Sequence, residues 1–115
     1  MRFVLLLHED EQVWARAGAT ERADHVRRHD AFSEAVRARG ELVGGEALSA
    51  VAAATTVRRD AESTTVTEGP YAETVEQLGG FYVVDLPDLD AVLEAVALLP
   101  PYSVEVRPVV DLDDR

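Results

Sequence analysis

Apolar residues follow two different periods along the chain, and together they predict a mixed domain of strands and helices. Residues 3–7 and 81–86 are apolar at nearly every position, which is typical of strands covered on both faces. A helical period predicts one helix from Thr20, as its N-cap, to about residue 39, and a second that starts after Asp88. Gly40 ends the first helix and a Pro-Pro pair ends the second.

The remaining segments complete a ferredoxin-like order. Residues 41–48 predict a strand with a Gly-Gly bend, and the β-branched stretches 55–59 and 63–67 predict a hairpin. A helical turn over 72–78 and a last strand over 104–110 follow. Without the additional hairpin strand the order is βαββαβ, which predicts an α+β fold with both helices on one face of an antiparallel sheet. We expect one domain over residues 1–115.

Strands that are apolar on both faces also predict how the protein associates. Helices cover only one face of such a sheet, yet both alternating sets of residues in 3–7 and 81–86 are apolar. A second copy of the same sheet would cover the other face. We therefore expect a face-to-face homodimer.

Charge and composition limit the classes of molecule that the protein is expected to bind. The formal net charge is −11, and all eleven cations are arginines, so phosphate backbones and anionic lipids would be repelled. Nucleic acid and membrane are therefore not expected as partners. Without cysteine there is neither a disulfide nor a thiolate metal site. The N-terminal apolar run of residues 3–7 is too short for a signal peptide or a spanning helix, so we expect a cytoplasmic protein.

Two of the three histidines lie on the predicted inner face of the first helix. His25, His29, Phe32 and Val36 are spaced by four, three and four residues. One interpretation makes His29 a core histidine bonded to a carbonyl or an acid. Another makes it a general base, a general acid or a hydrogen-bond donor in a pocket, with His25 at the rim, because an imidazole titrates near neutral pH. In a third interpretation a metal ion binds both histidines, with His8 or a carboxylate as the third ligand. This interpretation rests on spacing alone, and no metal and no cofactor are predicted.

The turn Glu68-Gly69-Pro70-Tyr71 is the second candidate for a site. Gly permits close backbone approach and Pro stiffens the turn, so Glu68 and the Tyr71 hydroxyl could be presented at a fixed place. A plain structural turn is the alternative. The candidate catalytic residues are thus His29, His25 and Glu68. The candidate substrate-binding residues are Tyr71, Gly69, Phe32 and His8.

The segment 66–82 contains this Glu-Gly-Pro-Tyr turn and ends in Leu-Gly-Gly-Phe-Tyr. It is similar to the signature of the YCII-related proteins of the DGPF group, named for an Asp-Gly-Pro-Phe turn. The similarity extends to residues 1–7, 44–48 and 104–109, and so to nearly the whole chain. The resemblance implies a dimeric α+β barrel with an enzyme-like pocket. Some members are encoded beside, or fused to, sigma factors of the extracytoplasmic-function type, which implies a regulatory role as an alternative.

The chain departs from the family pattern at two places. Glu68 and Tyr71 stand where the name motif has Asp and Phe. In the wider YCII-related group a first-helix His is thought to face an Asp that precedes a Pro-aromatic pair; here Pro100 stands before Pro101-Tyr102. Glu68 or another carboxylate replaces that acid, or the pair does not exist.

These observations lead to two hypotheses of function. In the first, a small organic molecule binds between the first helix and the sheet and undergoes acid–base chemistry at His29. In the second, the protein is a non-catalytic ligand-sensing or partner-binding module, with a sigma factor as its partner.

Overall fold

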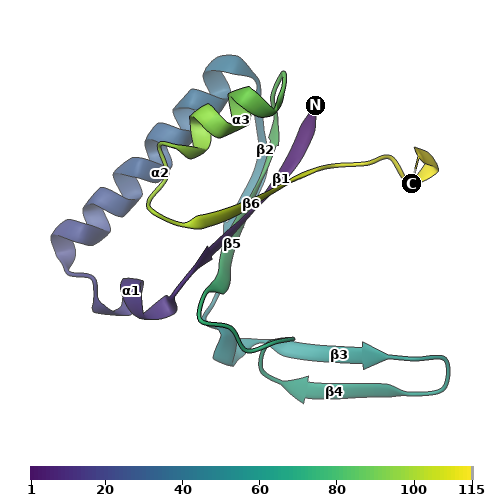
Figure 1. Ribbon diagram of the computed structural model, residues 1–115. Coiled ribbons are helices and arrows are strands. Elements are labelled where there is room, and N and C mark those ends of the chain that lie inside the picture. The colour runs from purple at the N-terminus through teal and green to yellow at the C-terminus, as the bar shows by residue number, and fades with distance from the viewer. Residues whose placement is uncertain (115) are drawn as a thin grey trace.

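A four-stranded antiparallel sheet forms the body of the protein (Figure 1). The computed structural model describes residues 1–114. The strands lie in the order β2-β5-β1-β6, and β1 is antiparallel to both of its neighbours. Their bounds are β1 Arg2–Glu9, β2 Glu41–Ala47, β5 Gln77–Asp85 and β6 Ser103–Pro108. The predicted α+β class is confirmed, and this strand order is compatible with a ferredoxin-like fold.

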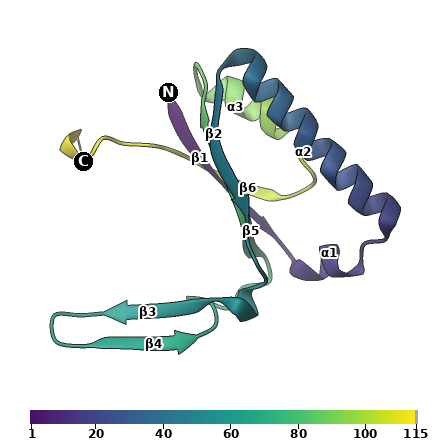
Figure 2. The ribbon, with the colours of Figure 1, turned by 180° about the vertical axis from the view of Figure 1, so that it is seen from behind.

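Helices α2 (Ala19–Arg39) and α3 (Leu89–Val96) lie side by side on one face of the sheet, as both views show (Figures 1 and 2). The carboxylate of Asp88 accepts a hydrogen bond from the backbone N–H of Ala91 at 2.9 Å, so the predicted cap of α3 is confirmed. The predicted cap of α2 is wrong, because the helix starts at Ala19 and Gly18 is its N-cap. A short helix, α1 (Glu11–Arg16), lies between β1 and α2, in a segment for which the sequence pattern predicts no element.

The core lies between these helices and one set of strand residues. Phe3, Leu5 and Leu7 of β1 are buried against Phe32 and Val36 of α2, which confirms the predicted inner stripe of that helix. Further members come from β5, α3 and the turns that flank α3: Val84, Leu86, Ala91, Val92, Ala95 and Leu99. Phe32 has no exposed surface at all, and a side chain of that size buried fully contributes about 3 kcal/mol of transfer free energy.

The other face of the sheet is also apolar at its centre. Val4 and Leu6 of β1 alternate with the core residues and point away from the helices, as do Phe81 and Val83 of β5. Neither α2 nor α3 lies on this side (Figures 1 and 2). The alternation thus gives the chain a second apolar surface beyond its own core.

A hairpin of β3 (Thr55–Arg59) and β4 (Thr64–Glu68) projects from one end of the sheet, away from the helices (Figure 1). The hairpin confirms the prediction, but its residues are mostly exposed. The radius of gyration, 16.3 Å, exceeds the roughly 13 Å of a compact chain of this length, which reflects such projections.

The remaining connections are short. Three-residue 3-10 helices lie at Val51–Ala53 and Leu112–Asp114. The helical turn predicted over 72–78 is wrong, since this stretch is bent chain and β5 already begins at Gln77. Within residues 1–114, no helix has both the length and the apolar content needed to cross a bilayer.

Candidate functional site

A cleft of 740 Å³ opens where the first half of α2 meets the end of the sheet. Helix α1 forms one wall, and small residues of β2 and β5 form the floor. The side chains that carry chemistry are, from α1 and the strand before it, Glu9, Glu11, Gln12 and Trp14; from α2, His25 and His29; and from the sheet side, Tyr82 and Tyr102. A volume of this size accommodates a small organic molecule.

His29 is held at both ring nitrogens by phenol hydroxyls. Its Nδ1 lies 2.6 Å from the hydroxyl oxygen of Tyr82, and its Nε2 lies 2.8 Å from that of Tyr102. Helix α2 supplies the histidine, β5 supplies Tyr82, and the segment between α3 and β6 supplies Tyr102. Three elements far apart in sequence therefore fix the orientation of one imidazole.

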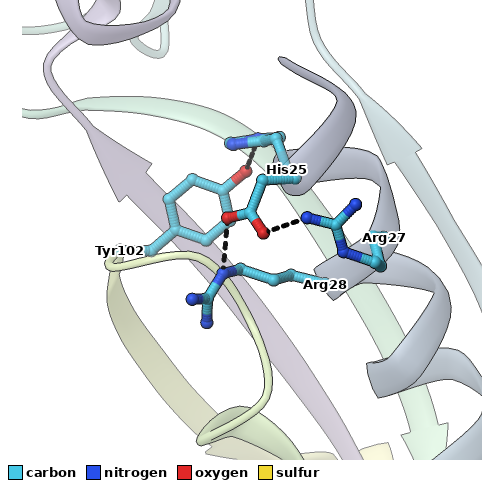
Figure 3. Close-up of polar contacts among 5 residues, drawn as sticks. His25, Arg27, Arg28 and Tyr102 are labelled. Carbon is cyan, nitrogen blue, oxygen red and sulfur yellow. Dashed lines mark hydrogen bonds and ion pairs between the residues drawn. The ribbon is translucent and has the colours of Figure 1, made fainter. Parts of the chain in front are cut away.

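The hydroxyl of Tyr102 also hydrogen-bonds Nε2 of His25, one turn earlier on α2 (Figure 3). The His25 ring lies between that tyrosine and Trp14 of α1, whose ring centroid is 4.9 Å away. On the outer side of the helix, the carboxylate of Asp24 accepts hydrogen bonds from Arg27 at 2.6 Å and Arg28 at 2.9 Å. That acid is therefore paired with arginines rather than with a histidine.

Local sequence explains why these groups converge. His25 and His29 are four residues apart on one helix and so share a face. Tyr82 pairs with Leu5 of β1, which places its ring on the face that the helices cover. Gly45 of β2 leaves room for that ring, because a Cβ there would come within 2.7 Å of a ring carbon of Tyr82.

The turn before β6 positions the second tyrosine. The backbone N–H of Tyr102 donates to the carbonyl oxygen of Pro100 at 2.7 Å, and the two prolines restrict the chain to a narrow range of φ. The resulting turn directs the Tyr102 hydroxyl at both histidines.

The hydrogen bonds permit two proton arrangements with all four groups neutral. In the first, Tyr82 donates to His29, His29 donates to Tyr102, and Tyr102 donates to His25. In the second, His25 donates to Tyr102, Tyr102 donates to His29, and His29 donates to Tyr82. A neutral imidazole has one donor and one acceptor nitrogen, so each arrangement satisfies every contact. The two arrangements interconvert when one proton shifts along each link, one proton is gained at one end of the series and one is lost at the other.

Burial keeps these groups neutral near pH 7. It lowers the pKa of His29 below 6.5, and the neighbouring His25 lowers it further, while Asp30 opposes the change. Burial also lowers the pKa of His25, against the opposing effect of Asp24. The same desolvation raises the pKa of both tyrosines, most strongly that of Tyr102, where the charge of Glu9 adds to the effect. Both imidazoles and both phenols are thus neutral near pH 7, and each of them can donate and accept a hydrogen bond.

The charged groups of the cleft are acids. Burial raises the pKa of Glu9, and the nearby Asp10 adds to that increase. The carboxylate of Glu11 accepts a hydrogen bond from the backbone N–H of Val51 at 2.7 Å and thereby ties α1 to the 3-10 helix after β2. Glu46 of β2 also borders the cleft, whereas none of its lining residues is an arginine.

Comparison with known proteins now places the chain in a family. The model of the YCII-related domain matches residues 1–113. The chain belongs to the YCII-related family. An uncharacterized protein of Rhizobium meliloti (strain 1021), R00369, is 34% identical over 113 residues, which cover 94% of this chain and 91% of that protein.

In this YCII-related protein the predicted site residues fall into separate places. His25 and His29 line the cleft together. Glu68, Gly69 and Tyr71 lie at and just after the end of the hairpin and are not among the lining residues; the side chain of Tyr71 is 78% exposed.

Two further candidates, Phe32 and His8, do not line the cleft. Phe32 is fully buried in the core. His8 alternates with Leu7 on β1 and points to the face opposite the helices, so it does not meet the histidines of α2. Within residues 1–114, no three side chains of the types that bind metal ions converge on one point.

Sequence reasoning did not identify Tyr82, Tyr102 or Glu9 as parts of this site. A signal for Tyr82 existed, since it is the polar-tipped residue in the strand 81–86 that shares parity with Val84 of the core. Tyr102 was noted only as the second member of the Pro-aromatic pair. Its hydroxyl, rather than a carboxylate, is what His29 meets near Pro100.

Proposed function

We propose that this protein binds a small organic molecule in the cleft and moves a proton to or from it through the chain His25–Tyr102–His29–Tyr82. The observation that supports this function best is the engagement of both His29 nitrogens by phenol hydroxyls. A core histidine needs only enough partners to satisfy its polar atoms. This one belongs to a continuous series of titratable groups that ends at a cleft.

The proton balance of the proposed step is simple. In the arrangement where Nε2 of His25 carries hydrogen, its Nδ1 is free to accept a proton from the ligand. The Nε2 proton then passes to Tyr102, the Tyr102 proton to Nε2 of His29, and the Nδ1 proton of His29 to Tyr82, whose own proton leaves to solvent. The four protein groups end neutral, and the ligand carries the charge change: a neutral carbonyl compound that has lost its α-proton becomes an enolate. The reverse sequence delivers a proton to the ligand.

Proton abstraction from carbon gives a direct test. Enolisable ketones and aldehydes are incubated with the protein in D₂O, and the loss of their α-proton signals is followed by NMR. The expected result is accelerated exchange that falls about 100-fold or more in His25→Gln, in line with typical general-base contributions. The rate should also fall in His29→Gln, which interrupts the series behind that base. His8→Gln, on the other face of the sheet, is the matched control and keeps the rate. No acceleration with any compound of the panel argues against catalysis.

A homodimer is part of the proposal. The support is the apolar centre of the uncovered face, formed by Val4, Leu6, Phe81 and Val83. The hairpin projects on that same side (Figure 2) and has few contacts with the rest of its own chain. An isolated two-stranded hairpin is marginal in water, so contact with a second copy would stabilise it.

A ligand-binding module without turnover is the second candidate. The observation in its favour is that, among residues 1–114, neither His25 nor His29 hydrogen-bonds a carboxylate that would orient it and stabilise an imidazolium. In that role the protein would report ligand binding to a regulator, for which the family resemblance suggests a sigma factor. Saturable binding of a compound in the cleft, with no exchange or turnover of any compound tested, would favour this candidate.

A further inference from the structure

The charge of the cleft lining indicates the charge of the ligand that it can bind. Three lining residues are acids, Glu9, Glu11 and Glu46, and the lining contains neither arginine nor lysine. The two histidines do not offset these charges near pH 7, because burial lowers the pKa of each of them. The cleft is therefore electronegative at the pH where the imidazoles are useful as bases.

Glu9 is the acid best placed to meet a ligand. It has the same parity on β1 as Leu7, so it lies on the face that the helices cover, and it is close enough to raise the pKa of Tyr102. Glu11, by contrast, is engaged by the N–H of Val51. Among residues 1–114, Glu9 forms no ion pair with an arginine, so its charge is uncompensated.

The rest of the lining is aromatic and small. Trp14 and Tyr82 present rings, and Gly79 and Gly80 of β5 expose backbone at the floor. Cations are attracted to the faces of such rings as well as to carboxylates. An anion would be repelled by the Glu9 carboxylate, and the lining contains no arginine or lysine to offset that repulsion. The guanidinium of Arg22 lies 4.5 Å from the centre of the Trp14 ring, but Arg22 is not part of the lining.

We propose that the cleft selects a small organic cation, an amine or ammonium group on an apolar body, with the Glu9 carboxylate as its ion-pair partner. The inference rests on the proposed function in one respect, that the same cleft is the binding site. It adds the chemical class of the ligand. A carboxylate or phosphate ester would be rejected.

A series of three probes of nearly equal shape tests the proposal. Phenethylammonium, 2-phenylethanol and 3-phenylpropanoate carry charges of plus one, zero and minus one on the same phenyl body. Binding is measured by the shifts of the His25 and His29 ring signals in NMR titrations at low salt. We expect the ammonium compound to bind at least tenfold more tightly than the alcohol, and 3-phenylpropanoate to give no saturable shift.

Variants assign the preference to one side chain. Glu9→Gln should reduce the ratio between ammonium and alcohol to less than about threefold, and salt should weaken it in the wild type. Glu34→Gln removes the same charge from the exposed face of α2 and should leave the ratio unchanged. Equal binding of ammonium and alcohol, tighter binding of the carboxylate, no binding of any probe, or an unaltered ratio in Glu9→Gln would each overturn the inference.

The proposed function and this inference fail in different ways. If neutral carbonyl compounds exchange protons in a His29-dependent reaction while the ammonium preference is absent, only the ligand class is wrong. If the ammonium probe binds through Glu9 but no compound undergoes exchange, the inference stands and the catalytic function falls.

Discussion

The hydroxyl of Tyr102 lies 2.8 Å from Nε2 of His29, at the point in the fold where the family resemblance predicted an acid. A phenol whose pKa is raised by burial stays protonated across the neutral range, so it can donate to an imidazole or accept from it. A carboxylate could only accept. Pro100 occupies the position at which the resemblance implies that acid, and His29 belongs instead to a neutral series of groups that can carry protons in either direction.

The two histidines of α2 should titrate as a coupled pair. A proton on His25 disfavours a proton on His29, whose ring centroid is 5.1 Å away. His25→Gln should therefore raise the pKa of His29 toward 6.5, while desolvation keeps it below that value. Ring-proton shifts followed by NMR between pH 4 and 8 measure this. His8→Gln serves as the control and should leave the titration of His29 unchanged; a drop in the His29 pKa in His25→Gln would contradict the coupling.

The two tyrosines should differ in their contribution to stability. Tyr102→Phe removes a hydroxyl that meets two imidazole nitrogens, whereas the hydroxyl that Tyr82→Phe removes meets only one imidazole nitrogen. We expect losses of about 1–3 kcal/mol and about 1 kcal/mol in the free energy of unfolding, since a half-buried unpaired group costs more than the mean hydrogen bond. Urea denaturation of the two variants gives the comparison. The idea fails if Tyr82→Phe proves the more costly change.

Stability should fall as the pH drops below about 6.5. The folded-state pKa of His25 and of His29 lies below the unfolded value of 6.5, so between those values the unfolded chain binds more protons. Their contribution to folding is complete above pH 6.5 and is lost as the pH falls through that value toward the lowered pKa. Thermal melts of wild type and His25→Gln/His29→Gln at pH 7.5 and 5.5 test this. The double variant should lose less stability between the two pH values than the wild type does.

Glu9 should affect the pH dependence of stability in the opposite direction to the histidines. Its folded-state pKa is raised above 4.5, so the folded chain binds more protons than the unfolded chain just above that pH, and stability is lost as the pH rises through the folded pKa. Glu9→Gln should therefore raise the melting temperature at pH 7.5 and have little effect at pH 4. Glu34→Gln, exposed on α2, provides the control for the change in net charge. A lower melting temperature for Glu9→Gln at pH 7.5 would show that the carboxylate stabilises the fold.

The periodicity of the chain was sufficient to predict the body of this fold. The inward stripe of α2 followed from the spacing of Phe32 and Val36, and the cap of α3 followed from Asp88 before an apolar run. The errors fell on short or weakly patterned segments. Helix α1 has six residues and no buried side chain, so no apolar stripe marks it.

The site residues that α2 supplies could be predicted from the sequence, whereas the tyrosines that complete the site could not. A helical wheel brings His25 and His29 to one face without knowledge of the rest of the chain. Tyr102 reaches them through a turn after α3, and such a contact between distant segments leaves no period in the sequence. The Glu-Gly-Pro-Tyr turn drew attention because glycine and proline suggest a rigid loop. Gly69 indeed has a φ of 104°, a conformation that favours glycine, but the turn lies at the base of the hairpin rather than among the residues that line the cleft.

The association state can be tested on the uncovered face of the sheet. Leu6→Lys places a charge among Val4, Phe81 and Val83, which would be desolvated in a face-to-face dimer, so we expect the protein to become monomeric at micromolar concentration. Val26→Lys is the matched control, because Val26 is 55% exposed on α2 and lies away from that face. Light scattering gives the mass of each variant. A wild type that is already monomeric, or a dimer that survives Leu6→Lys, would rule out the sheet face as the interface.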